Sequence, residues 1–136
     1  MISYEYLNLN PKGKKTCDCV IRALSLATGK SYEQVYREIF EISLKTGYML
    51  NEKRVEDKFL EQNGFIKIKQ PKKFDGTKYT IGELDWALTN SGRGESLGEA
   101  VIVRCAHHLT CVKDGVLYET WDCRRKCISN YFIKVK

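Results

Sequence analysis

The spacing of apolar residues divides the chain into a helical part followed by a strand-rich part. Apolar positions three or four residues apart predict a first helix over about 18–28, ended by Gly29. The same spacing predicts a second helix over 31–45 and a third over 51–62, and a fourth begins near residue 80. Three of these helices open on residues that commonly cap a helix N-terminus, namely Ser31, Asn51 and Thr80.

Alternating apolar and polar residues predict β-strands in the remainder of the chain. A short strand is expected over 65–69, and a Gly/Ser-rich loop at 90–98 precedes the strand-like segments 100–105, 108–112, 116–122 and 131–135. Residues 1–16 read as an irregular arm. Helices first and strands last predict an α+β fold, with N-terminal helices packed on a C-terminal antiparallel β-sheet. Since no repeat or linker interrupts the pattern, we expect a single domain over residues 1–136.

Composition places the chain among ordinary globular proteins. No N-terminal segment resembles a signal peptide, and no stretch approaches the ~20 apolar residues of a membrane helix, so we expect a cytoplasmic protein without membrane contact. In a reducing compartment the six cysteines are expected to be free thiols, metal ligands or catalytic groups rather than disulfides. The net charge of +6 comes from dispersed basic residues, which favours a solvated surface and leaves nucleic-acid binding as a minor alternative.

One cysteine stands at the predicted start of the first helix. Asp18 is expected to cap this helix through its carboxylate, which places Cys19 in the first turn. The positive end of the helix dipole there favours thiolate over thiol. Cys17 is the alternative nucleophile if the helix begins earlier, and a buried, unreactive cysteine is the plainer interpretation of Cys19.

A histidine and two acids lie on a predicted hairpin far downstream. A three-residue turn ending in Gly115 is our preferred register, and it places Asp122 on the same face of the sheet as His108. A two-residue Asp-Gly turn would instead bring Glu119 and Trp121 to that face. In the preferred register Asp122 orients the imidazole, and His108 accepts the proton of the cysteine thiol.

The stretches DCVIRALSLATGKSYEQVY and HLTCVKDGVLYETWDC together resemble small phage-associated or bacterial members of the papain-like cysteine peptidase superfamily. The resemblance implies a papain-like domain and a triad of Cys19, His108 and Asp122. It also implies attack on an amide, isopeptide or thioester bond of a peptide or protein through an acyl-enzyme thioester, with no cofactor.

The segment before the nucleophile departs from the pattern of this superfamily. Papain-like enzymes commonly carry a glutamine there that helps to hold the oxyanion, whereas this chain has Gly-Lys-Lys-Thr at 13–16. The backbone N–H of Cys19, together with Thr16, Lys14 or Asn10, is the expected substitute.

Two other classes of function remain open from the sequence. The missing glutamine and the positive charge are compatible with a papain-like binding protein without turnover, such as a phage protein that occupies a host factor. A structural zinc module is the other alternative, although none of the cysteines has paired Cys-x-x-Cys spacing; its ligands would come from Cys17, Cys19, Cys105, His107, His108, Cys111, Cys123 and Cys127.

Overall fold

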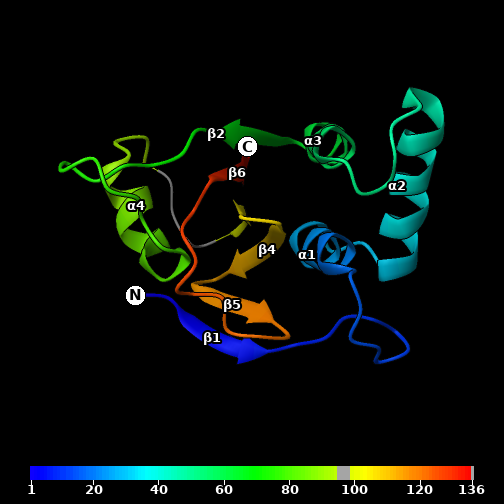
Figure 1. Ribbon diagram of the computed structural model, residues 1–136, viewed down its shortest axis with the longest axis horizontal. Helices are drawn as coiled ribbons and strands as arrows, with labels where there is room; N and C mark the ends of the chain where they lie inside the picture. Colours follow the sequence, from blue (N-terminus) through cyan, green and yellow to red (C-terminus); the bar gives the residue numbers. More distant parts are fainter. Residues whose placement is uncertain (95–98, 136) are drawn as a thin grey trace.

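The computed structural model describes residues 1–94 and 99–135, and the end of the predicted loop at 90–98 lies outside the described residues. Helices and a β-sheet form separate layers, as the α+β prediction requires (Figure 1). The elements are β1 (Ser3–Tyr6), α1 (Cys19–Thr28), α2 (Tyr32–Thr46), α3 (Lys53–Gln62), β2 (Phe65–Ile68), the 3₁₀ turn η1 (Ile81–Glu83), α4 (Leu84–Asn90), β3 (Ala100–Cys105), β4 (His108–Lys113), β5 (Val116–Glu119) and β6 (Asn130–Lys134).

The sheet is mixed, which corrects the expectation of a purely antiparallel one. Its described strands follow the order β1-β5-β4-β3-β6-β2, and β1 runs parallel to β5, with Ser3 opposite Val116. The irregular arm predicted at the N-terminus therefore contains an edge strand. Tyr4 and Tyr6 alternate with Ser3 and Glu5, but the strand is short and mostly exposed, and its pairing depends on a partner more than a hundred residues away.

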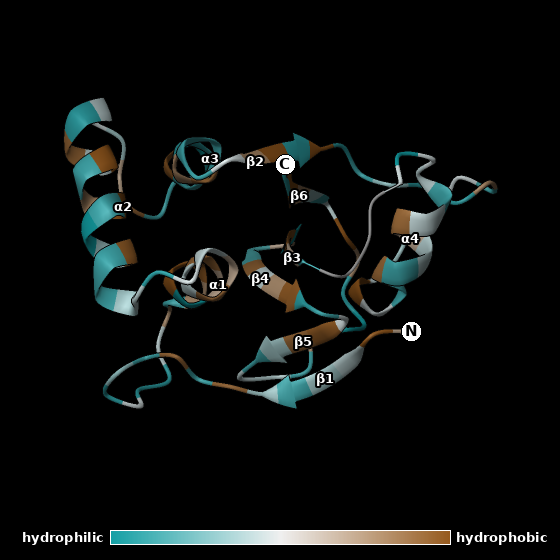
Figure 2. Ribbon diagram, turned by 180° about the vertical axis from the view of Figure 1, so that it is seen from behind, coloured by the Kyte–Doolittle hydropathy of each residue, from teal (hydrophilic) through white to brown (hydrophobic). Residues whose placement is uncertain are grey.

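Both faces of the sheet are covered. Helices α1, α2 and α3 lie on one side, with α2 outermost, and α4 lies on the other (Figure 1). The alternation along β3 serves both layers, because Ile102 packs with α1 and α3 while Val101 and Val103 pack with η1 and α4. Bands of hydrophilic and hydrophobic residues alternate along α2 in Figure 2, as expected for a helix that buries one face.

The helix boundaries agree closely with the sequence pattern, with one exception at α3. Gly29 ends α1 in the left-handed conformation, at φ 77°, and the Ser31 side chain accepts from the Gln34 backbone N–H at 3.1 Å. The N-cap of α3 is Glu52 instead of Asn51. Thr80 and Glu83 form the predicted capping box, at the start of η1.

The hairpin between β4 and β5 has a two-residue loop, so the three-residue register preferred from the sequence is wrong. Lys113 pairs with Val116 across the loop. Asp114 and Gly115 both have positive φ, at 51° and 76°. Two successive left-handed residues match the twist of the flanking strands, and aspartate tolerates that conformation better than most residues. Strand β5 then ends at Glu119, before the predicted end at residue 122.

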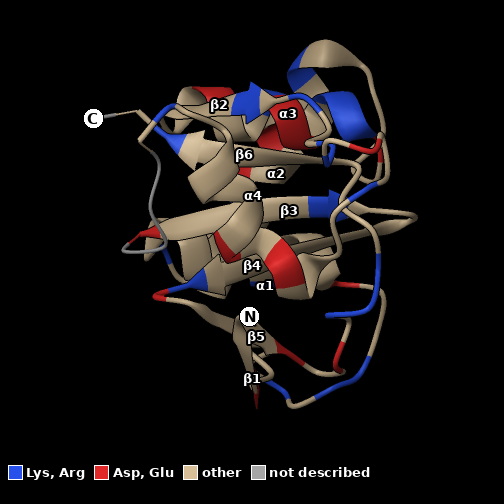
Figure 3. Cartoon of the chain, turned by 90° about the vertical axis from the view of Figure 1, so that its left-hand side faces the viewer, with Lys and Arg blue, Asp and Glu red and all other residues tan. Residues whose placement is uncertain are grey.

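Charged residues are spread over the molecule. Figure 3 shows basic and acidic positions interspersed on helices, strands and loops, in keeping with a solvated surface. Among the described residues, no helix combines the length and the apolar character needed to cross a membrane.

Candidate active site

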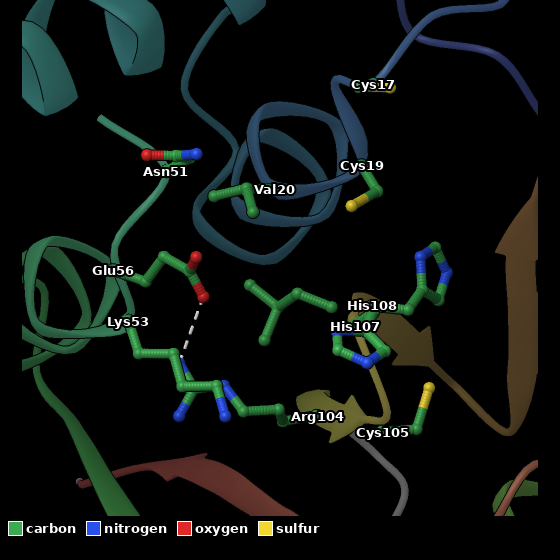
Figure 4. A pocket seen from close by; sticks show the side chains of 11 residues that line it. Cys17, Cys19, Val20, Asn51, Lys53, Glu56, Arg104, Cys105, His107 and His108 are labelled. Carbon is green, nitrogen blue, oxygen red and sulfur yellow. Dashed lines mark hydrogen bonds and ion pairs between the residues drawn. The ribbon is translucent and has the colours of Figure 1, made fainter. Parts of the chain in front are cut away.

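Cys19 and His108 lie next to each other although 89 positions separate them in the sequence. Cys19 is the first residue of α1 and His108 is the first residue of β4, and α1 packs against β4. Both side chains border a cavity of about 330 Å³ that Figure 4 shows from close by, and both also border a second cavity of about 250 Å³. The sequence prediction that these two residues meet agrees with this arrangement.

The surroundings of Cys19 favour its thiolate. Partial burial by itself would raise the pKa of the thiol. Hydrogen bonding with the His108 side chain and from the Leu109 backbone, together with the positive charges of His108 and Arg22, outweighs burial and lowers that pKa below its ordinary value. Cys19 therefore loses its proton more readily than a free cysteine does.

His108 is held from behind by a buried glutamate. Its Nε2 donates to Oε2 of Glu119 at 3.0 Å, and the Glu119 side chain is 2% exposed. Burial would lower the pKa of His108, but hydrogen bonding with Cys123, Cys19 and Glu119 raises it to about 12. Since Nε2 is occupied by Glu119, Nδ1 is the ring nitrogen left for the sulfur atoms of Cys19 and Cys123.

Glu119 keeps its charge despite its burial. Burial would raise its pKa, but hydrogen bonds with His108 and Arg22 and from the Thr120 backbone lower it to about 2. The Thr110 hydroxyl donates to the same Oε2 as His108, at 2.9 Å. The imidazolium consequently has a permanent carboxylate as its partner.

Asp122 does not contact His108, which corrects the triad expected from the sequence. Its carboxylate accepts two hydrogen bonds from the Arg124 guanidinium, at 2.9 and 2.8 Å, and a third from the Arg124 backbone N–H at 3.2 Å, and its side chain is 41% exposed. The two-residue turn moves Asp122 beyond the end of β5 and brings Glu119 and Trp121 beside the histidine. The rings of His108 and Trp121 have their centroids 5.2 Å apart.

Asp18 does not cap α1 through its side chain, contrary to the sequence prediction. Its buried carboxylate instead accepts from Arg22 Nε at 2.8 Å, from Asn10 Nδ2 at 3.0 Å and from the Tyr32 hydroxyl at 2.8 Å. Because these three donors occupy the carboxylate, it leaves the N–H groups of the first helical turn to other acceptors. The Cys19 N–H belongs to that turn.

The three residues suggested as oxyanion donors lie in different places. Thr16 borders the 250 Å³ cavity together with Cys19, and so does its neighbour Lys15. The Asn10 amide nitrogen is turned toward Asp18, and its oxygen accepts from the Lys12 backbone at 2.9 Å and from the Lys14 backbone at 3.4 Å. Asn10 and Lys14 therefore stabilise the loop, and Thr16 is the candidate that borders the reaction space.

The other thiols differ in their surroundings. Cys17 is exposed, whereas Cys105 and Cys123 are buried near His108, where burial raises the pKa of the Cys105 thiol. All six cysteines are free. Within residues 1–94 and 99–135, no three His, Cys, Asp or Glu side chains gather into a group suited to a metal ion, so the zinc module finds no support there.

Two members of this cluster were not identified as site residues from the sequence. Arg22 binds Glu119 directly, and Thr110 supports the same carboxylate. The spacing of Asp18 and Arg22, four residues apart on a helix that is otherwise apolar, is the signal that indicates a buried ion pair.

Comparison of the chain with models of protein families, with curated proteins and with solved structures finds no match.

Proposed function

We propose that the protein is a papain-like cysteine hydrolase that cleaves an amide, isopeptide or thioester bond in a peptide or protein. The observation that carries this proposal is the position of Cys19 at the start of α1, beside an imidazole whose Nε2 is bound to the buried Glu119. A thiol of lowered pKa next to a histidine oriented by an acid is the arrangement that activates a cysteine nucleophile. In this proposal Glu119 takes the role that the sequence suggested for Asp122.

The chemistry follows from the roles of the three side chains. The Cys19 thiolate attacks the carbonyl carbon. The oxyanion then accepts hydrogen bonds from the backbone N–H of Cys19, in the first turn of α1, and from the Thr16 hydroxyl. His108 donates its proton to the leaving amine, which departs and leaves an acyl-enzyme thioester. Water then gives a proton to His108 and attacks the thioester, releasing the acid and restoring the thiolate–imidazolium pair. Glu119 remains ionised throughout.

The cavities beside Cys19 are suited to an extended substrate. The cavity of about 330 Å³ lies toward Val20, Leu109 and His107, and the cavity of about 250 Å³ lies toward Thr16 and Trp121. Because both cavities border Cys19, a chain can cross the sulfur with side chains on either side. This supports a polymeric substrate such as a peptide rather than a compact metabolite.

A third cavity favours an apolar side chain in the substrate. It has a volume of about 210 Å³ between α1 and α2, and it is bordered by Val20, Ile21, Tyr36, Ile39 and Leu50. Val20, the residue that follows Cys19, also borders the 330 Å³ cavity, so the two cavities adjoin there.

A binding protein on the same fold is the second candidate. The Asn10 amide, the side chain nearest in type to the missing glutamine, donates to Asp18 instead of facing the cavities. Without a side-chain donor to the oxyanion, catalysis by such sites typically falls by about 10²–10³. The protein would then hold a peptide without cleaving it at a useful rate.

Turnover of a mixed peptide library separates these candidates. The native protein and Cys17→Ser are expected to generate new peptide termini and a transient acyl adduct on Cys19, both detected by mass spectrometry, whereas Cys19→Ala generates neither. Cleavage by Cys19→Ala at the native rate would contradict the proposed function. Retention of peptides by the native protein without new termini would favour the binding protein.

A further inference from the structure

The helix that carries the proposed nucleophile also carries a buried cation that reaches the proposed catalytic acid. We propose that Arg22 is a positioning residue of this site: it fixes the Glu119 carboxylate behind His108 and ties that carboxylate to the helix of Cys19. This inference rests on the proposed function for its catalytic meaning, but its test does not require turnover.

Arg22 spans the space between α1 and β5. It follows Cys19 by three residues on α1, so the two side chains lie on one side of the helix, and both border the 250 Å³ cavity. Its side chain is 9% exposed. Nε donates to Oδ1 of Asp18 at 2.8 Å, and Nη1 donates to Oε1 of Glu119. One planar guanidinium thus holds two carboxylates in fixed directions.

The two oxygens of Glu119 serve different partners. Oε1 accepts from Arg22 and from the Thr120 backbone N–H, the latter at 2.9 Å. Oε2 accepts from His108 at 3.0 Å and from Thr110 at 2.9 Å. With both oxygens occupied, the carboxylate has no freedom to rotate away from the imidazole. Without Arg22, Oε1 would keep the backbone N–H of Thr120 and the more distant Thr120 hydroxyl, at 3.4 Å, and would lose its charged donor.

Arg22 is itself held in place by a second set of contacts. Asp18 binds it from the preceding turn, and the other oxygen of Asp18 accepts from Asn10 and from Tyr32 of α2. The ionisable groups around the site therefore alternate in charge from Asp18 through Arg22 and Glu119 to His108 and then Cys19. Because arginine stays protonated at any pH that the fold survives, it favours the ionised form of Glu119. Its charge also favours the Cys19 thiolate directly.

The test measures the protonation of the thiol and the imidazole directly. Alkylation of Cys19 by iodoacetamide is followed against pH by mass spectrometry in the native protein, Arg22→Met and Arg22→Lys. The chain contains only two histidines, so NMR titration of their ring signals reports His108 against His107 in the same samples. Thermal unfolding is measured for each variant to confirm that it folds.

Arg22→Met is expected to move the alkylation midpoint upward and to slow alkylation about tenfold on the acidic side of that midpoint, the size of a pKa change of about one unit. The imidazole midpoint is expected to fall in parallel. Arg22→Lys keeps the charge without the fork and is expected to restore part of the shift; it also serves as the informative variant if Arg22→Met does not fold.

The control is Lys30→Met, which removes the half-buried ion pair with Glu38, a pair that borders neither cavity beside Cys19, and it is expected to leave the alkylation midpoint unchanged. Glu119→Gln is expected to shift the midpoint, with little further change when combined with Arg22→Met. Folded Arg22 variants with native midpoints for Cys19 and His108 would overturn the inference. If the native protein cleaves peptides but the Arg22 variants keep native midpoints, the role of Arg22 is wrong and the proposed hydrolase stands. If the midpoints shift in the Arg22 variants but the native protein cleaves no peptide, the hydrolase is wrong and the positioning role of Arg22 stands.

Discussion

Two buried arginines join helices to the sheet in this protein, and they do so with different consequences. Arg22 joins α1 to β5 through Asp18 and Glu119, and Arg104 joins β3 to α3 through Glu56 and Asp57. Their side chains are 9% and 5% exposed. Each therefore bridges two carboxylates in surroundings that exclude most water.

The carboxylates around the two arginines behave in opposite ways. Burial raises the pKa of Glu56, and the single Arg104 nitrogen that it shares with Asp57 does not offset this effect. Glu119 is also buried, yet hydrogen bonds from His108, Arg22 and the Thr120 backbone lower its pKa to about 2. The number of donors, and not the presence of an arginine alone, decides whether the pKa of a buried carboxylate is raised or lowered. Only the cluster around Arg22 maintains a permanent anion beside an imidazole.

The largest contrast is expected between Glu119→Gln and Glu56→Gln. Glu119→Gln leaves Arg22 and His108 without their shared anion, and breaking a buried pair of this kind typically costs about 3–5 kcal/mol. Glu56→Gln removes a carboxylate that burial already penalises and leaves Arg104 paired with Asp57, so a smaller loss is expected. Urea unfolding at neutral pH measures both. Equal losses of unfolding free energy in the two variants would contradict the proposed difference between the Arg22 and Arg104 clusters.

The pH dependence of stability is expected to differ in sign between the two glutamates. The lowered pKa of Glu119 means that its contribution is fully present above its ordinary value of 4.5 and is lost as pH falls toward about 2. The raised pKa of Glu56 means that the folded state binds its proton more tightly, so stability falls as pH rises above 4.5. Unfolding curves between pH 2 and 7 test this, because Glu119→Gln should flatten the acid limb and Glu56→Gln should deepen it.

The raised pKa of His108 makes the free energy of unfolding depend on pH in the alkaline range as well. Its pKa is raised from 6.5 to about 12, so its charge stabilises the fold fully below pH 6.5, and this contribution is lost as pH rises toward about 12. His108→Gln is therefore expected to unfold more easily than the native protein at pH 6, with the difference shrinking at higher pH. A difference that grows with pH would show that the buried imidazole is neutral.

The smallest effect is expected at the carboxylate that the sequence favoured. Asp122 forms an ion pair with Arg124 at the surface, and exposed pairs of this kind contribute about 0–1 kcal/mol. Asp122→Asn should leave the pH profile of Cys19 alkylation unchanged, whereas Glu119→Gln should shift it upward. An equal upward shift of the alkylation midpoint in Asp122→Asn would mean that Asp122 orients the imidazole, as the three-residue turn predicted and contrary to the structure.

The parts of the fold that depend on local sequence were predictable, and those that depend on distant partners were not. The start of α1 at Cys19 and its end at Gly29 follow from spacing and turn chemistry within a few residues. The parallel pairing of β1 has no local signature, because its strand is exposed and its partner lies far along the chain.

The candidate site also combines features set by local sequence with features set by distant partners. The helix start at Cys19 and the strand at His108 follow from local patterns, whereas their juxtaposition was expected from the resemblance to papain-like enzymes. The identity of the acid depends on the conformation of Asp114. A single residue at φ 51° decides whether the loop contains two residues or three, and so whether residue 119 or 122 faces the imidazole. Asp18 matches the pattern of a helix cap, yet Asn10, Arg22 and Tyr32 occupy its carboxylate through contacts that a local pattern does not contain.

The most direct measurement is the rate of iodoacetamide alkylation of Cys19 as a function of pH, in the native protein and in His108→Ala. If an ion pair between sulfur and imidazole underlies the chemistry, the native thiol reacts well below the pH at which free cysteine does, and His108→Ala moves the midpoint upward. A native thiol that titrates like free cysteine, with no change in His108→Ala, would contradict the account.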